Sequence, residues 1–487
     1  MAVFDYPSLY QINTRVRHRL FCRDRGGAAG IDDWPDSEWQ GMAEQGFDWV
    51  WLLGVWQTGQ AGAQVSRSHE PWQQGFRASL ADLNEDDICG SCFAVTSYRT
   101  AECLGTDEAL AGVRKKLNER GLKLMLDFVP NHTALDHPWV RKHPEFYIQG
   151  SKEDLAREPQ NYIELESAQG KQVFAYGRDP FFDGWPDTLQ LDYSNPKVQE
   201  SMIAELLAIA ERCDGVRCDM AMLILPDVFE RTWGKPIEPF WPKAIPAVRE
   251  RIPDFMLLAE VYWDLEWTLQ QQGFDYTYDK RLYDRLRDRA CRPVHDHLVA
   301  GLDFQNKLAR FLENHDEPRA AETFPPEVHE AAAIVTFLSP GLRLFHDGQL
   351  TGNRVHIPIH LCRGPEEADD RRLSEFYSGL LQTLQRPVFR SGEWALAECR
   401  PAEGGNESWQ DFIVYRWRSA DETAWVAVNY AAQPSQCRLE WPRNQKGRNQ
   451  KQVLLSSQQQ KPGVEINEEG MRLDFPAWGY LVFTLPD

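Results

Sequence analysis

The chain has 487 residues, and its composition and charge exclude several classes of protein. Hydrophobic residues make up 42% and charged residues 26%, which is ordinary for a folded globular protein and unlike a disordered or fibrous one. The 73 acidic and 53 basic side chains give a net charge of −20. This charge would repel a phosphate backbone, so nucleic acid is not an expected partner.

The apolar segments and cysteines indicate the compartment. Residues 1–15 lack the basic and apolar regions of a secretory signal, and no apolar run approaches the roughly 18 residues that a membrane helix needs. The ten cysteines are scattered along the chain, without the dense spacing of a disulfide framework. We therefore expect a cytoplasmic protein with reduced thiols and no membrane partner.

Short apolar runs alternate with helical patterns over most of the chain. The runs are residues 9–16, 49–53, 122–129, 215–218, 255–259, 274–278, 311–313 and 342–345. Because they are continuous, they predict strands of a parallel sheet that is covered on both sides. Helices are predicted over 107–120 and from Pro196 onward, with Asn195 as the N-cap of the second. Eight strand–helix repeats predict a (β/α)8 TIM barrel of the α/β class, in which catalytic groups lie at the C-terminal strand ends.

Two connections and the C-terminal part depart from this repeat. Residues 54–97 and 133–188 are too long for simple loops. After a helix over 369–385, alternating patterns at 412–417, 424–429, 453–455 and 480–485 predict an antiparallel β-sandwich. Residues 444–461, rich in Gln, Lys and Asn, are expected to form solvated hairpin loops around one strand. The predicted domains are a barrel over 1–132 and 189–385, a small inserted domain after the third strand over 133–188, and a C-terminal β-sandwich over 386–487.

Ionisable residues end four of the predicted barrel strands. Strand three runs into residues 127–132, strand four into 217–219, strand five into Glu260, and strand seven into 313–316. Any one carboxylate could be a salt-bridged structural group. A set at consecutive C-terminal strand ends is hard to explain in that way, because burying unpaired charges is costly.

Three of these carboxylates suit glycoside cleavage, in which one group attacks the sugar carbon and another protonates the leaving oxygen. Arg217 lies two residues before Asp219, so both side chains face the same way and the cation favours the charged carboxylate. Asp219 is therefore the expected nucleophile. Glu260 follows four apolar residues, a setting that raises the pKa of a general acid. Asp316, beside His315, is expected to hold sugar hydroxyls.

The segments DFVPNH (127–132), GVRCD (215–219), Glu260 and NHD (314–316) resemble, in this order, the four signature regions of the alpha-amylase family of glycoside hydrolases, glycoside hydrolase family 13. The resemblance covers roughly residues 5–385, and the family's usual C-terminal β-domain extends it to the end. It implies a retaining double displacement with Asp219 as nucleophile, Glu260 as acid/base and Asp316 as transition-state stabiliser.

The same resemblance implies further substrate-binding residues. His132, Arg217 and His315 would bind the sugar in subsite −1, with Asp127 supporting Arg217. Phe93 stands where the family usually has a Tyr that stacks on this sugar. The segment Trp185-Pro186-Asp187 resembles the motif that closes the family's inserted domain.

The sequence also departs from the family pattern. Starch-cleaving members usually carry a Lys-His pair where this chain has Met222 and Leu223, so the +1 side is expected to be less polar than in a typical endo-amylase. Tyr262 and Trp263, just past Glu260, could form a sugar-stacking wall or pack in the core. Trp72, in the long connection after the second predicted strand, could also reach the cleft.

No cofactor is expected to be required and no metal site is predicted. Asn131 is the one candidate calcium ligand, because the family usually has a ligand there, but its partners are not identifiable in the sequence. The alternative is a side-chain hydrogen bond that organises the loop.

The leading hypothesis is hydrolysis of α-glucosidic bonds in gluco-oligosaccharides or small α-glucosides. Transglycosylation or phosphorolysis on the same fold stays open, since Lys280 and Arg281 near the end of strand six could bind an anion or form a solvated surface. A non-catalytic barrel, like the family-related heavy chains of amino-acid transporters, is disfavoured because the carboxylates are retained and a membrane helix is missing from the sequence.

Overall fold

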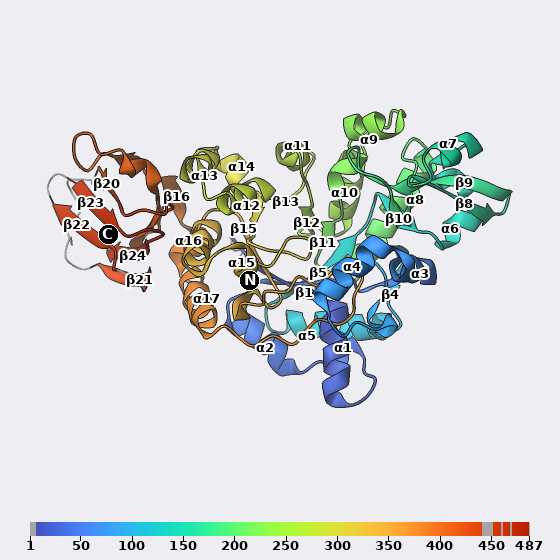
Figure 1. Ribbon diagram of the computed structural model, residues 1–487, viewed down its shortest axis with the longest axis horizontal. Coiled ribbons are helices and arrows are strands. Elements are labelled where there is room, and N and C mark those ends of the chain that lie inside the picture. The colour runs from blue at the N-terminus through green and yellow to red at the C-terminus, as the bar shows by residue number, and fades with distance from the viewer. Residues whose placement is uncertain (1–5, 441–450, 459–460, 468–469, 487) are drawn as a thin grey trace.

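A closed barrel of eight parallel strands forms the centre of the protein (Figure 1). The computed structural model describes residues 6–440, 451–458, 461–467 and 470–486. In their order around the barrel, the strands are β1 (Ser8–Asn13), β15 (Leu342–His346), β14 (Leu308–Arg310), β13 (Tyr276–Tyr278), β12 (Met256–Ala259), β11 (Gly215–Cys218), β5 (Lys123–Phe128) and β2 (Trp49–Leu53). Pairing of β2 with β1 closes the ring. The predicted TIM barrel is confirmed.

Two strands differ from their predicted ranges for identifiable reasons. The first strand was expected to continue to residue 16, but it ends at Asn13, whose side chain accepts a hydrogen bond from the Val16 N–H and starts helix α1 (Thr14–Arg25). The seventh was expected at 311–313, but β14 comes three residues earlier. Its last residue, Arg310, is fully buried and pairs with Asp279 at 2.6 Å, so a charged side chain occupies a position where an apolar pattern has no signal.

Helices surround the barrel, and several begin with a side-chain cap. Thr106 caps α5 (Asp107–Asn118), and Asn195 caps α8 (Pro196–Ala210), which confirms both predicted helix starts. The other longer helices are α2 (Asp36–Glu44), α9 (Pro226–Trp233), α10 (Trp241–Arg251), α12 (Lys280–Arg287), α13 (Cys291–Leu298), α16 (Pro326–Phe337) and α17 (Arg371–Leu384). Short helices complete the ring: α11 (Glu266–Gln271), α14 (Leu302–Gln305), α15 (Ala320–Thr323) and α18 (Pro387–Ser391). In the described part of the chain, none of the helices combines the length and the apolar character needed to cross a membrane.

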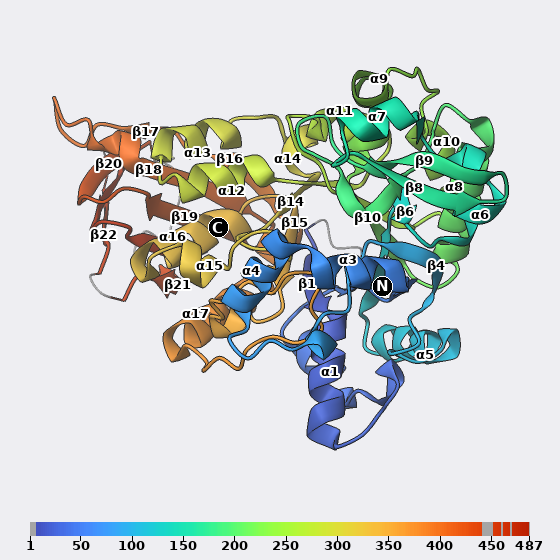
Figure 2. The same cartoon turned by 45° about the vertical axis from the view of Figure 1, so that its right-hand side comes forward.

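The two long connections carry their own secondary structure at the C-terminal end of the barrel. The connection after β2 contains β3 (Trp56–Thr58), α3 (Gln60–Ser68), α4 (Glu70–Ser79) and β4 (Val95–Thr100). The connection after β5 contains β6 (His132–Ala134), α6 (Pro138–Lys142), β7 (Gln149–Gly150), α7 (Lys152–Arg157), β8 (Tyr162–Ser167), β9 (Gly170–Gly177) and β10 (Trp185–Gln190). Its strands form a separate sheet in the order β6-β10-β9-β7, with β8 beside β9. Helix α3 packs against β10, so the two connections meet (Figure 2).

The C-terminal part is the predicted antiparallel β-sandwich, at the opposite end of the molecule from the inserted sheet (Figure 1). One sheet has the order β16 (Glu393–Leu396), β18 (Phe412–Arg418), β19 (Glu422–Asn429), β24 (Tyr480–Pro486) and β21 (Gln452–Ser456). The other has the order β17 (Cys399–Arg400), β20 (Ser435–Leu439), β23 (Gly470–Phe475) and β22 (Gly463–Asn467). Residues 444–461 were expected to form hairpin loops around one strand. Within this stretch β21 is that strand, and residues 444–450 and 459–460 lie outside the described residues.

The alternation of β18 joins the sandwich to the barrel. Phe412 and Val414 face the second sheet, whereas Tyr415 and Trp417 face the barrel. The Trp417 indole donates to the Leu338 carbonyl at 2.7 Å, just beyond α16, all of whose residues from Val328 on are buried. Barrel and sandwich thus share one hydrophobic core.

Candidate active site

A cavity of about 250 Å³ lies at the C-terminal ends of the barrel strands. Its walls come from the barrel, the inserted sheet and two loops far apart in the sequence. The lining residues are Trp72, Ser91, Phe93, His132, Trp185, Asp187, Thr188, Arg217, Asp219, Met220, Glu260, Tyr262, Asp316, Ile359 and His360. All three predicted catalytic carboxylates are among them.

Arg217 joins two of these carboxylates. Its Nη1 lies 2.5 Å from Asp219 Oδ1, and its Nη2 lies 2.7 Å from Glu260 Oε2. The two acids are held in register because the backbone pairing continues past the strands: Asp219 N–H donates to the Phe128 carbonyl and Glu260 N–H to the Cys218 carbonyl. One buried guanidinium therefore neutralises part of the charge of both acids, and not of Asp219 alone as the sequence suggested.

Aromatic rings enclose the Arg217 guanidinium. Its central carbon lies 5.0 Å from the ring centre of Phe93, 5.5 Å from that of Trp51 and 5.8 Å from that of Tyr278. Rings at these distances attract a cation and exclude water. The arrangement fixes the side chain whose two nitrogens contact the acids.

Glu260 is the carboxyl group best suited to carry a proton. Burial raises its pKa to about 8, the Asp219 and Asp316 charges act in the same direction, and Arg217 opposes them. Its Oε2 accepts the Met220 N–H at 2.6 Å, and its Oε1 accepts the Tyr262 hydroxyl at 2.9 Å. The raised pKa agrees with the apolar setting noted in the sequence and favours the protonated form of Glu260 near neutral pH.

Met220 adopts a left-handed backbone conformation, with φ of 42° and ψ of 44°. A non-glycine residue pays for this conformation with steric strain, which is tolerated where the surroundings enforce it. The turn follows Asp219 directly and aims the Met220 N–H at Glu260. The strain thus positions one acid relative to the other.

The other predicted sugar-binding groups cluster around Asp219. His132 Nε2 lies 4.0 Å from Asp219 Oδ2, and the Phe93 ring borders the cavity. Asp316 is held at 3.1 Å from His315 Nε2, and its side chain is 38% exposed. His315 itself lies behind Phe93, at 5.5 Å between ring centres, and Gln11 contacts its Nδ1 at 2.7 Å.

Besides His315, two predicted substrate-binding residues lie away from the cavity lining. The Asp127 carboxylate accepts hydrogen bonds from the Trp51 indole at 3.0 Å and the Gly54 N–H at 2.7 Å, so it shapes the floor beneath Arg217 instead of meeting a sugar. Trp263 also adopts a positive φ, 64°, which turns its ring outward against Phe181 at 5.0 Å. Tyr262, by contrast, faces the cavity.

The two residues at the positions of the family's usual Lys-His pair are apolar and do not line the cavity. Met222 and Leu223 are buried in the core, and neither lines the cavity. Met220 and Tyr262 border it beside Glu260 instead.

One wall of the cavity brings together segments that no local sequence signal connects. Trp72 of α4 packs against His360, with 4.4 Å between ring centres, and His360 Nδ1 contacts the Ser66 hydroxyl at 2.9 Å. Trp72 was an open candidate in the sequence, but Ile359 and His360 were not singled out. Their position depends on a loop after the last barrel strand, which sequence spacing does not reveal.

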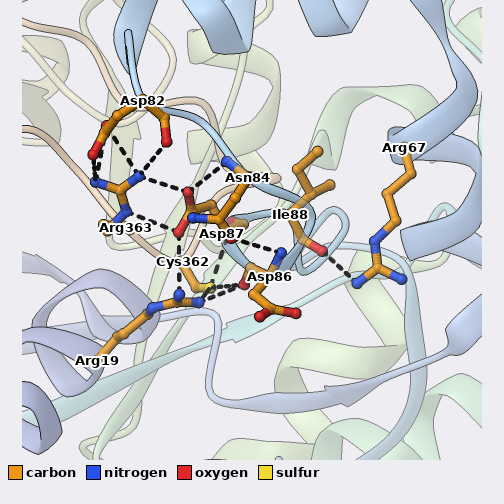
Figure 3. A network of polar contacts seen from close by, with 9 residues as sticks. All are labelled: Arg19, Arg67, Asp82, Asn84, Asp86, Asp87, Ile88, Cys362 and Arg363. Atoms are coloured by element: carbon orange, nitrogen blue, oxygen red, sulfur yellow. Dashed lines mark hydrogen bonds and ion pairs between the residues drawn. The ribbon is translucent and has the colours of Figure 1, made fainter.

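A network of ion pairs fastens this wall (Figure 3). Arg363 Nη2 lies 2.7 Å from Asp87 Oδ2 and 3.1 Å from Asp82 Oδ1, and Arg19 Nη2 lies 3.1 Å from Asp87 Oδ1. Asp87 is fully buried, and the hydrogen bonds from Arg363 hold its pKa below the usual value. The network joins the connection after β2 to the loop that carries His360.

Asn131, the candidate calcium ligand, has its oxygen committed to an N–H donor. Gln190 Nε2 donates to Asn131 Oδ1 at 3.0 Å, and Asn131 Nδ2 donates to Gln190 Oε1 at 3.2 Å. Calcium requires six to eight oxygen ligands, among them carboxylates. Across the ranges that the structure describes, no group of three or more His, Cys, Asp or Glu side chains could hold a metal ion. The residues present therefore do not fit a calcium site, and the amide pair organises the loop.

Comparison with known proteins places the chain in a family. Residues 93–355 match the family model of the alpha amylase catalytic domain, so the chain belongs to the alpha-amylase family. Alpha-amylase 3 of Dictyoglomus thermophilum is 25% identical over 288 residues, 56% of this chain and 56% of that protein. Alpha-amylase MalA of Haloarcula japonica is 23% identical over 373 residues, 73% of this chain and 50% of that protein. The chain thus matches about half the length of these relatives.

Among solved structures, the alpha-amylase of Geobacillus thermoleovorans complexed with acarbose is similar to this chain, with a TM-score of 0.68. The two are 18% identical, and the alignment covers 100% of both chains. The similarity shows that they have the same fold.

Proposed function

We propose that this protein is a retaining α-glycosidase that hydrolyses α-glucosidic bonds in gluco-oligosaccharides or small α-glucosides. The observation that carries the proposal is the Arg217 guanidinium, which contacts both Asp219 and Glu260 at one wall of a sugar-sized cavity. Glu260, with a pKa of about 8, supplies a proton, and Asp219, held by Arg217, supplies a nucleophile.

The reaction follows from these two roles. Asp219 attacks the anomeric carbon while Glu260 protonates the leaving oxygen, which gives a glycosyl-enzyme ester and a free alcohol. Glu260, now charged, takes a proton from a water that attacks the same carbon and releases the sugar. Because one guanidinium spans the two carboxylates, their spacing supports the shorter separation of retaining enzymes over the wider one of inverting enzymes.

The cavity supports a small glycone site. Its volume of about 250 Å³ is comparable to that of one hexose unit, and the rings of Trp72 and His360 close one side. The relatives named above are alpha-amylases, and one related structure was obtained with acarbose, which supports α-linked glucose units as substrates.

Hydrolysis is favoured over phosphorolysis because the cations that could bind phosphate are already paired. Lys280 Nζ lies 2.5 Å from Asp284 and 3.3 Å from Glu317, and Arg281 pairs with Asp264. Product analysis of malto-oligosaccharide digests with and without phosphate distinguishes the two reactions. Sugar phosphate in the products would favour phosphorolysis.

The central test is Asp219→Asn. Removing the nucleophile should lower kcat/KM on α-glucosides by about 10⁴-fold or more. Asp227→Asn, the same change at an exposed position of α9, is the matched control and should leave kcat/KM unchanged. NMR of the fresh product should show an α-anomer.

Two results would contradict the proposal. Near-normal turnover by Asp219→Asn would show that Asp219 is not the nucleophile. A β-anomer as the first product would exclude a retaining reaction. Sugar binding without turnover in the wild type would instead favour a non-catalytic barrel.

A further inference from the structure

Asp187 is a buried carboxyl group in the cavity wall that the proposed reaction does not use. Its residue is 3% exposed, and it lines the cavity beside Trp185 and Thr188. Its Oδ2 is buried without a hydrogen-bond partner, and no ion pair to Asp187 occurs among the described residues. Burial raises its pKa to about 7.

The position of Asp187 is set by two packed elements. It is the third residue of β10, and α3 packs against this strand through Gly62. A Cβ atom at Gly62 would stand 3.8 Å from Asp187 Cβ and 3.4 Å from Ala94 Cβ, so the helix backbone packs closely against the base of the Asp187 side chain. The remaining open direction is toward the cavity.

Neighbouring polar groups of the wall are already satisfied. The Thr188 hydroxyl donates to the Trp185 carbonyl at 3.2 Å, and His360 Nδ1 contacts the Ser66 hydroxyl. A buried carboxyl group without such a partner is costly to the folded state. Groups of this kind are kept where a ligand completes their hydrogen bonding.

Asp187 also lies in the same wall as the groups that would hold the reacting sugar. Its neighbour Trp185 packs against His132, with 5.3 Å between ring centres, and His132 lies 4.0 Å from Asp219. A sugar held by His132 and Asp219 therefore presents its hydroxyls to this part of the wall.

We propose that Asp187 is a specificity-determining residue that accepts a hydrogen bond from one hydroxyl of the glucose unit held in the cavity. The proposal rests on the proposed function for the identity of the sugar. It predicts that the site discriminates glucose from an analogue that lacks this hydroxyl, because the analogue would leave the carboxyl group unpaired.

The experiment is calorimetric titration of D-glucose and its 2-, 3-, 4- and 6-deoxy analogues into the wild type and Asp187→Ala. In the wild type, one deoxy analogue should bind about 10- to 100-fold more weakly than glucose, as expected for a hydrogen bond to a carboxylate. Asp187→Ala should weaken glucose binding by a similar factor and bind that analogue as the wild type does. Asp183→Ala, the same change at an exposed position that does not line the cavity, should keep the wild-type order of affinities.

Thermal unfolding without sugar separates a binding role from a structural one. Because Asp187→Ala removes an unpaired buried carboxyl group, its Tm should be equal to or higher than that of the wild type. A lower Tm, with binding of all five sugars weakened equally, would assign Asp187 to structure and overturn the proposal. Unchanged glucose affinity in the variant, or no glucose binding by the wild type, would overturn it as well.

These titrations need no turnover, so the two proposals can fail separately. Coupling between Asp187 and one hydroxyl, in a protein that cleaves no glycoside, would contradict the proposed function alone. Turnover that depends on Asp219, without such coupling, would contradict only the role of Asp187.

Discussion

Arg217 and Glu260 together determine the protonation state in which the site can act. The guanidinium stabilises negative charge on Asp219, while burial keeps the proton on Glu260. The two carboxyl groups therefore have different environments although both contact the same cation. This difference in environment is what lets two like residues take opposite roles.

The pH dependence of catalysis should report Glu260. Its pKa is raised to about 8, so the group is protonated below that pH and loses its proton above it. We expect kcat/KM to be sustained up to about pH 8 and to fall at higher pH, with Glu260→Gln slow and lacking this decline. Steady-state rates across pH 5–10 measure both.

Glu266 provides the matched control for this profile. Burial raises its pKa to about 7, but it does not line the cavity. Glu266→Gln should therefore keep the alkaline decline. A decline that disappears in Glu266→Gln and persists in Glu260→Gln would refute the assignment of the acid.

At the scale of single residues, the sequence indicated the catalytic groups because each follows a strand directly. Asp219 and Glu260 come one residue after β11 and β12, so strand pattern and charge were sufficient to bring them together. Trp263 does not line the cavity: it has a positive φ and packs against Phe181, and no local pattern indicates such a turn at a tryptophan. Asp187 was singled out only as part of the motif that closes the inserted domain, because its lack of a partner is a property of its surroundings.

Among the elements, the wall that carries Trp72 and His360 depends on ion pairs between two loops. Arg363→Ala leaves the fully buried Asp87 with fewer cations, so the free energy of unfolding should fall by about 3 kcal/mol. The KM for glucosides should rise, because the loop with His360 is no longer fastened. Denaturant unfolding and steady-state kinetics measure these two effects.

An exposed ion pair is the control for this change. Arg371 contacts Glu375 at 2.7 Å on the surface of α17, and its loss should change neither stability nor KM measurably. An Arg363→Ala variant that is less stable but has an unchanged KM would show that the wall does not depend on the network. Since Arg363 lowers the pKa of Asp87, the wild-type contribution should be lost as pH falls through that lowered value.

The elements that the sequence predicted best are those whose pattern is local. Continuous apolar strands and capped helices indicated the barrel, with errors at the end of β1, where Asn13 caps α1, and at β14, where the buried Arg310 interrupts the apolar pattern. In the sandwich, the apolar alternation indicated β18, β19, β21 and β24, while short or polar strands such as β17 and β22 gave no such pattern. Contacts between distant loops, such as Asp87 with Arg363, have no local signal at all.

Over the whole molecule, barrel and sandwich should unfold as one unit. Trp417 is fully buried between them, 4.9 Å from the Tyr6 ring, and it donates to the Leu338 carbonyl. Trp417→Ala should lower the free energy of unfolding by about 3–5 kcal/mol and shift a single cooperative transition. Differential scanning calorimetry measures the number of transitions.

Trp267, which is 45% exposed, is the matched control, and Trp267→Ala should change stability by less than about 1 kcal/mol. Two separate transitions, of which Trp417→Ala shifts only one, would show that the barrel and the sandwich are independent.

The pairing of the first barrel strand with the last has a consequence for synthesis on the ribosome. β1 pairs with β15, Ser8 opposite Arg343, and Asp87 meets Arg363 across 276 residues of chain. At roughly 5–20 residues per second, the earlier partner waits from about a quarter of a minute to a minute for the later one. During that interval the free edge of β1 is open to pairing with other chains. Protection of the nascent protein is thus needed most before residue 343 emerges, and a sugar can assist folding only after that point.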